Sequence, residues 1–261
     1  MHKLAISPGL AERVKQRTGK LHPFDHLDSR RTALVVIDLQ NYFMKGEGGA
    51  NAQAIVPAVN RLAGELRARG GHVIWVRNST EGTLKNWSVK HQWLKNPELG
   101  KYRYDEMSKD GDGFKFWRAL DIQPGDAKLV KKRFSAFIQG SSPIEKHLRA
   151  RKIDTILVTG TATNVCCEST ARDAMMLNFK VVMVADALAA RDDEFHNASL
   201  SAFYSNFGDV QTVEEVLESL DRGTKKPAQV PRTSRPSALA AARKSLSSVA
   251  NGSARRWASS R

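Results

Sequence analysis

Three ionisable side chains in this sequence have the right chemistry for covalent catalysis. Asp38 lies near the end of one apolar run, Lys131 near the end of a second, and Cys166 follows a third after a short turn. A carboxylate beside a thiol can accept its proton, and a nearby ammonium group stabilises both negative charges. The competing interpretation is a plain ion pair, since a buried carboxylate usually has a partner. We expect Cys166 to act as a nucleophile that needs neither a histidine nor a metal.

The surroundings of Cys166 favour a reactive thiol. The residue follows the apolar run 155–160 and the turn 161–164, where a helix should begin. Free N–H groups at the start of a helix lower the pKa of a thiol and can bind the oxyanion of a tetrahedral intermediate. Thr163 or Asn164 can cap this helix. A buried structural cysteine is the alternative, because free cysteines are commonly buried.

The elements that carry these residues should form a parallel α/β sheet. The run 32–39 is almost continuously apolar, which is typical of a strand buried on both faces. Further strands are predicted at residues 72–77, 128–132, 155–160, 181–185 and 209–213. Helices are predicted at residues 57–69, 143–151, 165–177, 193–203 and 213–220. This alternation predicts a doubly wound, mostly parallel six-stranded sheet with helices on both faces, a three-layer sandwich that binds ligands beyond the carboxyl ends of its strands.

Three segments resemble the signatures of the isochorismatase-like cysteine hydrolases. They are VVIDLQNYF (35–43), KKRFSAF (131–137) and VTGTATNVCCESTARDA (158–174). They follow the family's order within about residues 32–220, so the resemblance implies the isochorismatase-like fold. It also implies that Asp38 is the general base, that Lys131 supports it and that Cys166 attacks an amide carbon. It further implies a cis peptide between Thr161 and Ala162, and an oxyanion hole formed by the N–H groups of Ala162 and Cys166.

Departures from the subfamilies narrow the reaction that the resemblance implies. Isochorismatases proper lack the nucleophilic cysteine, so Cys166 implies hydrolysis of a C–N bond through a thioester. Nicotinamidases carry metal-binding Asp and His residues after the second strand, whereas here only His91 remains, and a lone histidine is far more often structural than a ligand. Asn78 and the run ATNVCCESTARD are similar to ureidoacrylate amidohydrolases and related carbamoyl-amide hydrolases.

We therefore expect a ureidoacrylate-type amidohydrolase that acts on a small amide without metal or cofactor. A nicotinamidase or a maleamate-type amidase is the alternative. Cys167 stands where the family usually has Val, and we expect it to be an inert core thiol.

Residues 78–124 lack helical or strand periodicity and form a long excursion, and such excursions are usually functional. We single out Asn78, Trp87 and Arg133 as candidate contacts for a small carboxylated amide. The cations Arg77, Lys85 and Lys90 could also line a pocket for such a compound, although surface charge is the simpler interpretation of any single one of them. The excursion could equally form a lid or an interface, and the resemblance implies a homo-oligomer.

The charge of the chain is concentrated at one end. Nine of the basic residues behind the formal net charge of +14 lie from residue 225 onward, where no acidic residue occurs. This Ser-, Ala- and Arg-rich tail buries too little to offset its ordering entropy, so we predict disorder there. The predicted organisation is an N-terminal extension (1–31), a hydrolase domain (32–222) and a basic tail (223–261). The rival function is a scaffold whose tail binds polyanions, although the mildly basic remainder gives no reason to expect nucleic acid as a partner.

The cysteines and the N-terminus indicate the compartment. Cys166 and Cys167 are adjacent and cannot easily form an ordinary disulfide, which favours a reducing environment. The N-terminus lacks the apolar stretch of a signal peptide, and no run of about 18 apolar residues occurs. We therefore expect a cytoplasmic protein without a membrane partner.

Overall fold

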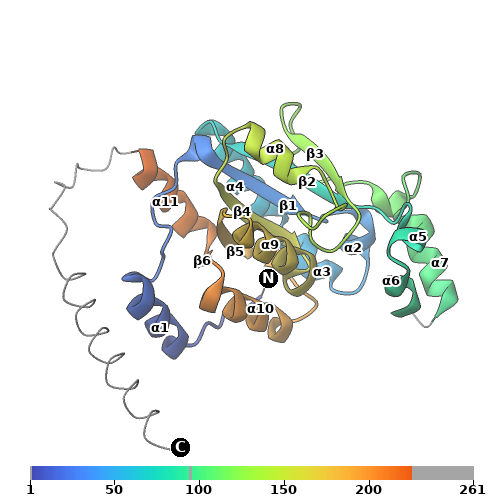
Figure 1. Cartoon of the computed structure of the whole chain (residues 1–261), viewed down its shortest axis with the longest axis horizontal. Helices are drawn as coiled ribbons and strands as arrows, with labels where there is room; N and C mark the ends of the chain where they lie inside the picture. Colours follow the sequence, from blue (N-terminus) through green and yellow to red (C-terminus); the bar gives the residue numbers. More distant parts are fainter. Residues whose placement is uncertain (1, 94–95, 225–261) are drawn as a thin grey trace, which may run out of the picture. The chain divides into compact units, whose positions relative to one another are not determined.

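A single parallel sheet organises the chain. The computed structural model describes residues 2–93 and 96–224, so the predicted tail from residue 225 onward lies outside the described residues. The strands are β1 (Thr32–Ile37), β2 (His72–Asn78), β3 (Ala127–Lys131), β4 (Thr155–Thr161), β5 (Lys180–Ala189) and β6 (Asp209–Gln211). They lie in the order β3-β2-β1-β4-β5-β6, and every neighbouring pair is parallel (Figure 1). The predicted doubly wound α/β fold is confirmed, with a sheet that is entirely parallel.

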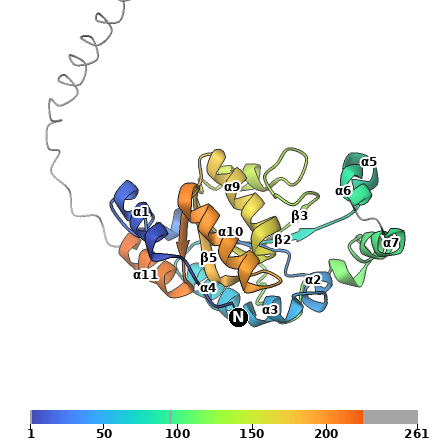
Figure 2. The same ribbon diagram turned by 90° about the horizontal axis from the view of Figure 1, so that it is seen from below.

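Helices cover both faces of this sheet. One face packs against α1 (Pro8–Thr18), α8 (Ile144–Ala150), α9 (Glu168–Met176) and α10 (Asp193–Asn206). Figure 2 shows α9 and α10 side by side over that face. The other face packs against α2 (Asn41–Lys45), α3 (Gly49–Ala54), α4 (Val56–Ala68) and α11 (Val213–Thr224). Each face therefore has its own apolar core.

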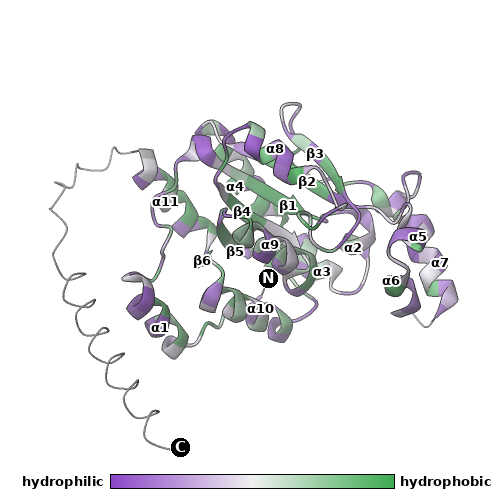
Figure 3. Cartoon of the chain, viewed as in Figure 1, coloured by the Kyte–Doolittle hydropathy of each residue, from purple (hydrophilic) through white to green (hydrophobic). Residues whose placement is uncertain are grey.

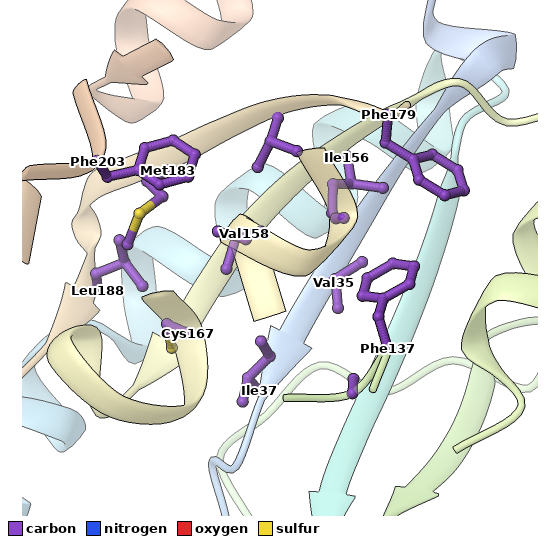
Figure 4. Close-up of a cluster of buried hydrophobic side chains, with 14 of the residues drawn as sticks. Val35, Ile37, Phe137, Ile156, Val158, Cys167, Phe179, Met183, Leu188 and Phe203 are labelled. Atoms are coloured by element: carbon purple, nitrogen blue, oxygen red, sulfur yellow. The ribbon is translucent and has the colours of Figure 1, made fainter. Parts of the chain in front are cut away.

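The apolar run of β1 explains its central place. All of its residues are buried, and alternate side chains point to opposite faces of the sheet. Val35 and Ile37 join the core beneath α9 and α10, where Figure 4 shows them near Ile156 and Val158 of β4. Leu34 belongs to the core on the other face. The strands β1 and β4 are accordingly coloured as hydrophobic in Figure 3.

The strand order reverses between β1 and β4. The first strand pairs with β2 on one side and with β4 on the other, so the chain changes direction across the sheet at this point. Ladder pairing continues to Ile37 and Gly160, where a Cβ on Gly160 would collide with the carbonyl oxygen of Ile37. Gly160 has a φ of 111°, which side chains rarely allow. Glycine thus keeps β1 and β4 close just before the turn that leads to Cys166.

Several predicted boundaries differ from the observed ones. The first strand ends at Ile37 instead of Leu39 because Asp38 has a φ of 56° and turns the chain. The predicted helix 165–177 is a π-helical turn, η3 (Thr163–Cys167), followed by α9. The expected cap by Thr163 or Asn164 was wrong. Ala162 is the N-cap, it makes no side-chain cap bond, and the Thr163 hydroxyl pairs with a histidine.

The excursion after β2 contains short helices that the sequence pattern did not predict. They are α5 (Thr83–Asn86), α6 (Ser88–Trp93) and α7 (Pro97–Glu106), followed by the 3-10 turn η2 (Asp112–Phe114). An isolated bridge between Gln40 and Phe116 ties the end of this segment to the loop after β1. The helical part of the excursion therefore starts and ends at the carboxyl edge of the sheet, and the chain then returns to the amino edge, where β3 begins.

The N-terminal extension is folded onto the sheet domain. It contains α1, whose Leu10 and Val14 are part of the core on the α9 and α10 side, and the 3-10 turn η1 (Ser29–Arg31). Across residues 2–93 and 96–224, no helix is long and apolar enough to cross a membrane.

Candidate active site

Asp38, Lys131 and Cys166 meet at the carboxyl edge of the sheet. The Nζ of Lys131 lies 2.8 Å from Oδ2 of Asp38 and 3.3 Å from Sγ of Cys166. The same Nζ donates to the backbone oxygen of Arg133 at 3.1 Å. Two of these contacts are hydrogen bonds, to Cys166 and Arg133, and the contact with Asp38 is an ion pair. The side chains of Asp38 and Lys131 are fully buried, and Cys166 is 6% exposed.

The fold brings these residues together from separate elements. Asp38 directly follows β1, and Cys166 lies in the turn after the neighbouring β4. Lys131 ends β3, which is separated from β1 by β2, so its long side chain spans the end of the intervening strand. All three groups lie beside the point where the strand order reverses, which is where open parallel sheets bind ligands.

The electrostatics of Cys166 differ from the expectation based on its position in the sequence. A helix start was expected to lower the pKa of this thiol, but burial raises it to about 12. Lys131 opposes this rise, whereas the negative charge of Asp38 adds to it. Burial dominates because the thiolate would lose its hydration in the apolar core. Cys166 is therefore a protonated thiol at neutral pH.

Lys131 keeps its proton despite complete burial. Burial alone would lower its pKa, but the charges of Asp38 and Cys166 raise it above the ordinary value. Neither carboxylate oxygen of Asp38 has a hydrogen-bond partner among the described residues, although Oδ2 lies in the ion pair with Lys131. A carboxylate without hydrogen bonds keeps its lone pairs available to take a proton from the adjacent thiol.

The turn before Cys166 has the backbone that the resemblance implies. The peptide bond between Thr161 and Ala162 is cis, which confirms that expectation. Thr163 bonds through Oγ1 to Nδ1 of the buried His196 at 3.0 Å, which fixes the first residue of η3. A cavity of about 240 Å³ lies against this turn, lined in part by Ala162 and Asn164. The oxyanion-hole roles of the Ala162 and Cys166 N–H groups stay predictions.

Cys167 lies in different surroundings from its neighbour. It is fully buried in the core beneath α9 and α10, where Figure 4 shows it close to Leu188 and Val158. Its Sγ lies 3.8 Å from the backbone oxygen of Thr159, and burial raises its pKa well above the ordinary value. This environment suits a structural thiol.

The weaker candidates Asn78, Trp87 and Arg133 also gather near the site. Asn78 donates through Nδ2 to the backbone oxygen of Arg133 at 3.2 Å. The guanidinium of Arg133 lies over the Trp87 ring at 5.3 Å and donates to the backbone oxygens of Lys132 and Asn86. Arg133 thus ties the loop after β3 to the excursion, and its role as a substrate contact stays a prediction.

One charged residue near the site stands out only in the structure. Lys90 of α6 is 8% exposed, and its Nζ has no hydrogen-bond partner among the described residues. The sequence analysis could not separate it from the neighbouring cations that could line the pocket, because nothing in its immediate neighbours marks it as buried. Its burial depends on Trp87 and Phe134, whose rings lie 4.5 and 5.3 Å from the Nζ.

His91 has a local partner rather than a metal-binding environment. Its Nε2 lies 2.8 Å from Oγ1 of Thr83, and burial lowers its pKa. Over the described ranges 2–93 and 96–224, no group of three or more His, Cys, Asp or Glu residues could hold a metal ion.

A fully parallel α/β sheet with these signature segments at its carboxyl edge defines a class of hydrolase. The chain belongs to the isochorismatase family, since the model of the isochorismatase domain matches residues 32–215. It is 34% identical to the isochorismatase family protein YecD of Escherichia coli O157:H7 over 74% of this chain and 98% of that protein. It is 31% identical to the ureidoacrylate amidohydrolase RutB of Methylobacterium radiotolerans over 77% of this chain and 84% of RutB.

Solved structures agree with this assignment. A cysteine hydrolase from Pseudomonas syringae pv. phaseolicola superimposes with a TM-score of 0.67 at 28% identity, covering 76% of this chain and 95% of the other. An N-carbamoylsarcosine amidase from Thermoplasma acidophilum superimposes with a TM-score of 0.57 at 26% identity, covering 70% and 97%. The expectation of an isochorismatase-like hydrolase is confirmed.

Proposed function

We propose that this hydrolase cleaves the C–N bond of a small amide, ureido or carbamoyl compound through a thioester on Cys166. The observation that carries the proposal is the position of the Lys131 ammonium, which contacts both the Asp38 carboxylate and the Cys166 sulfur. This arrangement holds a nucleophile next to a base and balances the charge that forms during attack. The similarity to RutB, an ureidoacrylate amidohydrolase, supports a ureido substrate.

The first half of the reaction forms the acyl-enzyme. The Cys166 sulfur attacks the carbonyl carbon while its proton passes to Asp38. The carbonyl oxygen becomes an oxyanion, which the N–H groups of Ala162 and Cys166 stabilise. The C–N bond then breaks, Asp38 returns the proton to the departing nitrogen, and ammonia or an amine leaves.

The second half restores the enzyme. A water molecule gives a proton to Asp38 and attacks the thioester carbon. The C–S bond breaks, the sulfur regains its proton from Asp38, and a carboxylic or carbamic acid leaves. Lys131 stays protonated throughout, which agrees with the direction of its pKa. The pKa of about 12 for Cys166 makes this proton transfer to Asp38 necessary, because little thiolate exists beforehand.

An ammonia-release screen tests the proposal. Ureidoacrylate, N-carbamoyl amino acids, maleamate, biuret and nicotinamide are incubated with the full chain, and ammonia is measured. We expect release from at least one ureido or carbamoyl compound, and loss of release in Cys166→Ala. The proposal fails if no compound is hydrolysed, or if Cys166→Ala releases ammonia at the same rate.

A further inference from the structure

Lys90 is a buried cation that lacks a protein anion. Its Nζ makes no hydrogen bond to any described residue, and no ion pair to it is found within residues 2–93 and 96–224. The ring faces of Trp87 and Phe134 surround it at 4.5 and 5.3 Å. Aromatic faces attract a cation, but they do not replace the hydrogen bonds that an ammonium makes in water. The free protein therefore holds this group in an incompletely satisfied state.

The position of Lys90 relates it to the proposed active site. Phe134, one of its two aromatic neighbours, lies in the loop that begins with Lys131. The other neighbour, Trp87, also carries the guanidinium of Arg133 on its ring. The charges of Asp38 and Cys166 are near enough to affect the pKa of Lys90. Lys90 thus links the excursion to the carboxyl edge of the sheet.

The electrostatic balance around Lys90 favours an incoming anion. Burial, together with the positive charges of Arg103 and Lys131, lowers its pKa to about 7 against the opposing effect of Cys166 and Asp38. Lys131 already has its own carboxylate partner. The Nε of Arg103, like the Nζ of Lys90, is buried without a hydrogen-bond partner among the described residues. This region has unused cationic donors and lacks a matching acceptor.

We propose that Lys90 binds a carboxylate of the substrate, so that the compound hydrolysed at Cys166 is a small amide or ureido acid. This inference rests on the proposed function and names its substrate class. A carboxylate supplies the acceptor that the Lys90 ammonium lacks. Binding through Lys90 would hold the substrate by its acidic end and leave its amide or ureido end for Cys166.

The test compares two alkylating agents that differ only in charge. Iodoacetate carries a carboxylate, and iodoacetamide is its neutral counterpart of nearly equal size. Both react with the same sulfur, so the ratio of their rates at Cys166 cancels any change in the reactivity of the thiol. The rates are measured by peptide mapping at about pH 6, below the pKa of about 7 at which Lys90 loses its proton.

The variant Lys90→Met removes the charge and keeps the length of the side chain. We expect the iodoacetate to iodoacetamide ratio to fall by about tenfold or more relative to the unaltered protein, as for the loss of a charge-assisted hydrogen bond. Lys85→Met is the matched control, because Lys85 is exposed on the neighbouring α5, and its ratio should not change. An equal ratio in Lys90→Met and the unaltered protein would overturn the inference.

Two further comparisons distinguish the role of Lys90 from a folding defect and from the proposed amidase activity. Removing an unpaired buried charge should not lower the melting temperature, and Lys90→Gln provides a second variant if Lys90→Met does not fold. Alkylation requires no turnover, so the ratio is informative whatever the ammonia screen shows. A fall in the ratio without hydrolysis of any compound would retain the anion site and reject the amidase. Hydrolysis of a compound together with an unchanged ratio in Lys90→Met would retain the amidase and reject the anion site.

Discussion

The two adjacent cysteines allow a direct test of the nucleophile. The sulfur of Cys166 accepts a hydrogen bond from the Lys131 ammonium, whereas the sulfur of Cys167 donates to the backbone oxygen of Thr159 within the apolar core. We predict that one equivalent of iodoacetamide labels Cys166 first and stops hydrolysis, because Cys166 lies beside the Asp38 and Lys131 pair whereas Cys167 lies in the core. Peptide mapping locates the label.

The matched control is Cys167→Val, which should retain most of the activity because Val is close in size to the buried Cys167. A label found first on Cys167 would place the nucleophile one residue further along the chain. A folded but inactive Cys167→Val protein would lead to the same conclusion.

The Asp38 carboxylate can be tested without changing its shape. We predict that Asp38→Asn lowers kcat by roughly 10²–10⁴-fold, the usual contribution of a positioned general base. The fully buried Lys131 would lose its charge partner, which should cost about 3–5 kcal/mol of unfolding free energy. Steady-state kinetics and urea unfolding measure the two effects.

A second substitution separates catalysis from stability at this pair. Asp38→Asn combined with Lys131→Met removes the unpaired charge, so much of the stability should return while kcat stays at least as low as in Asp38→Asn. Normal turnover in Asp38→Asn would mean that another group accepts the proton.

Elements with long apolar runs were the predictable part of the fold. The sequence of β1 is apolar on both faces, and this property alone indicates a central parallel strand. Its end at Ile37 was not predictable, because the positive φ of Asp38 reflects the contacts of that residue in the folded protein. The short helices α5 and α6 were also missed, since a single turn carries too little periodicity to be detected.

Family signatures in the sequence identified the site residues, but the burial and the pKa values of these residues could be known only from the folded structure. The sequence could place Asp38, Lys131 and Cys166 at one edge of the sheet, yet it predicted the wrong direction for the pKa of Cys166. Complete burial results from packing between distant segments, which local sequence does not encode. The burial of Lys90 was not predictable for the same reason, because its neighbour Phe134 lies far along the chain.

The N-terminal extension is tied to the last elements of the domain through His22. Its Nδ1 lies 3.1 Å from Asp209 at the start of β6, and its Nε2 lies 3.5 Å from Glu215 of α11. Hydrogen bonds to Asp209 and Glu215 raise the pKa of His22 from 6.5 to about 10. This bond network connects the segment before β1 to the far edge of the sheet.

This raised pKa predicts a pH-dependent contribution to stability. A folded-state pKa above the unfolded value gives stability that is complete below about pH 6.5 and disappears as the pH rises through about 10. We predict that His22→Gln lowers the unfolding free energy at about pH 6 by roughly 1–3 kcal/mol, allowing for solvent screening, and has little effect above pH 10.

Urea unfolding at several pH values, followed by tryptophan fluorescence, measures this difference. His26→Gln is the control, because the side chain of His26 is 55% exposed. A difference that stays constant with pH would mean that His22 contributes by packing and not by its charge.

For the molecule as a whole, we predict that activity survives prolonged treatment with EDTA. The ammonium of Lys131 lies where it can balance the charge of Asp38, and the attacking group is a thiol instead of a bound water. Turnover is measured before and after chelation, with a metal-dependent amidase treated in parallel. Loss of turnover that zinc or manganese restores would contradict the proposed mechanism.

The strand order divides the proposed catalytic groups between the two halves of the sheet. Asp38 follows β1 and Lys131 ends β3, both in the half that comes first along the chain, whereas Cys166 follows β4 in the second half. Only the ladder between β1 and β4 joins these halves within the sheet. A nascent chain that has emerged as far as β3 thus carries an acid–base pair with no sulfur to activate. The three groups of the proposed site therefore meet only where the second half of the sheet pairs with the first.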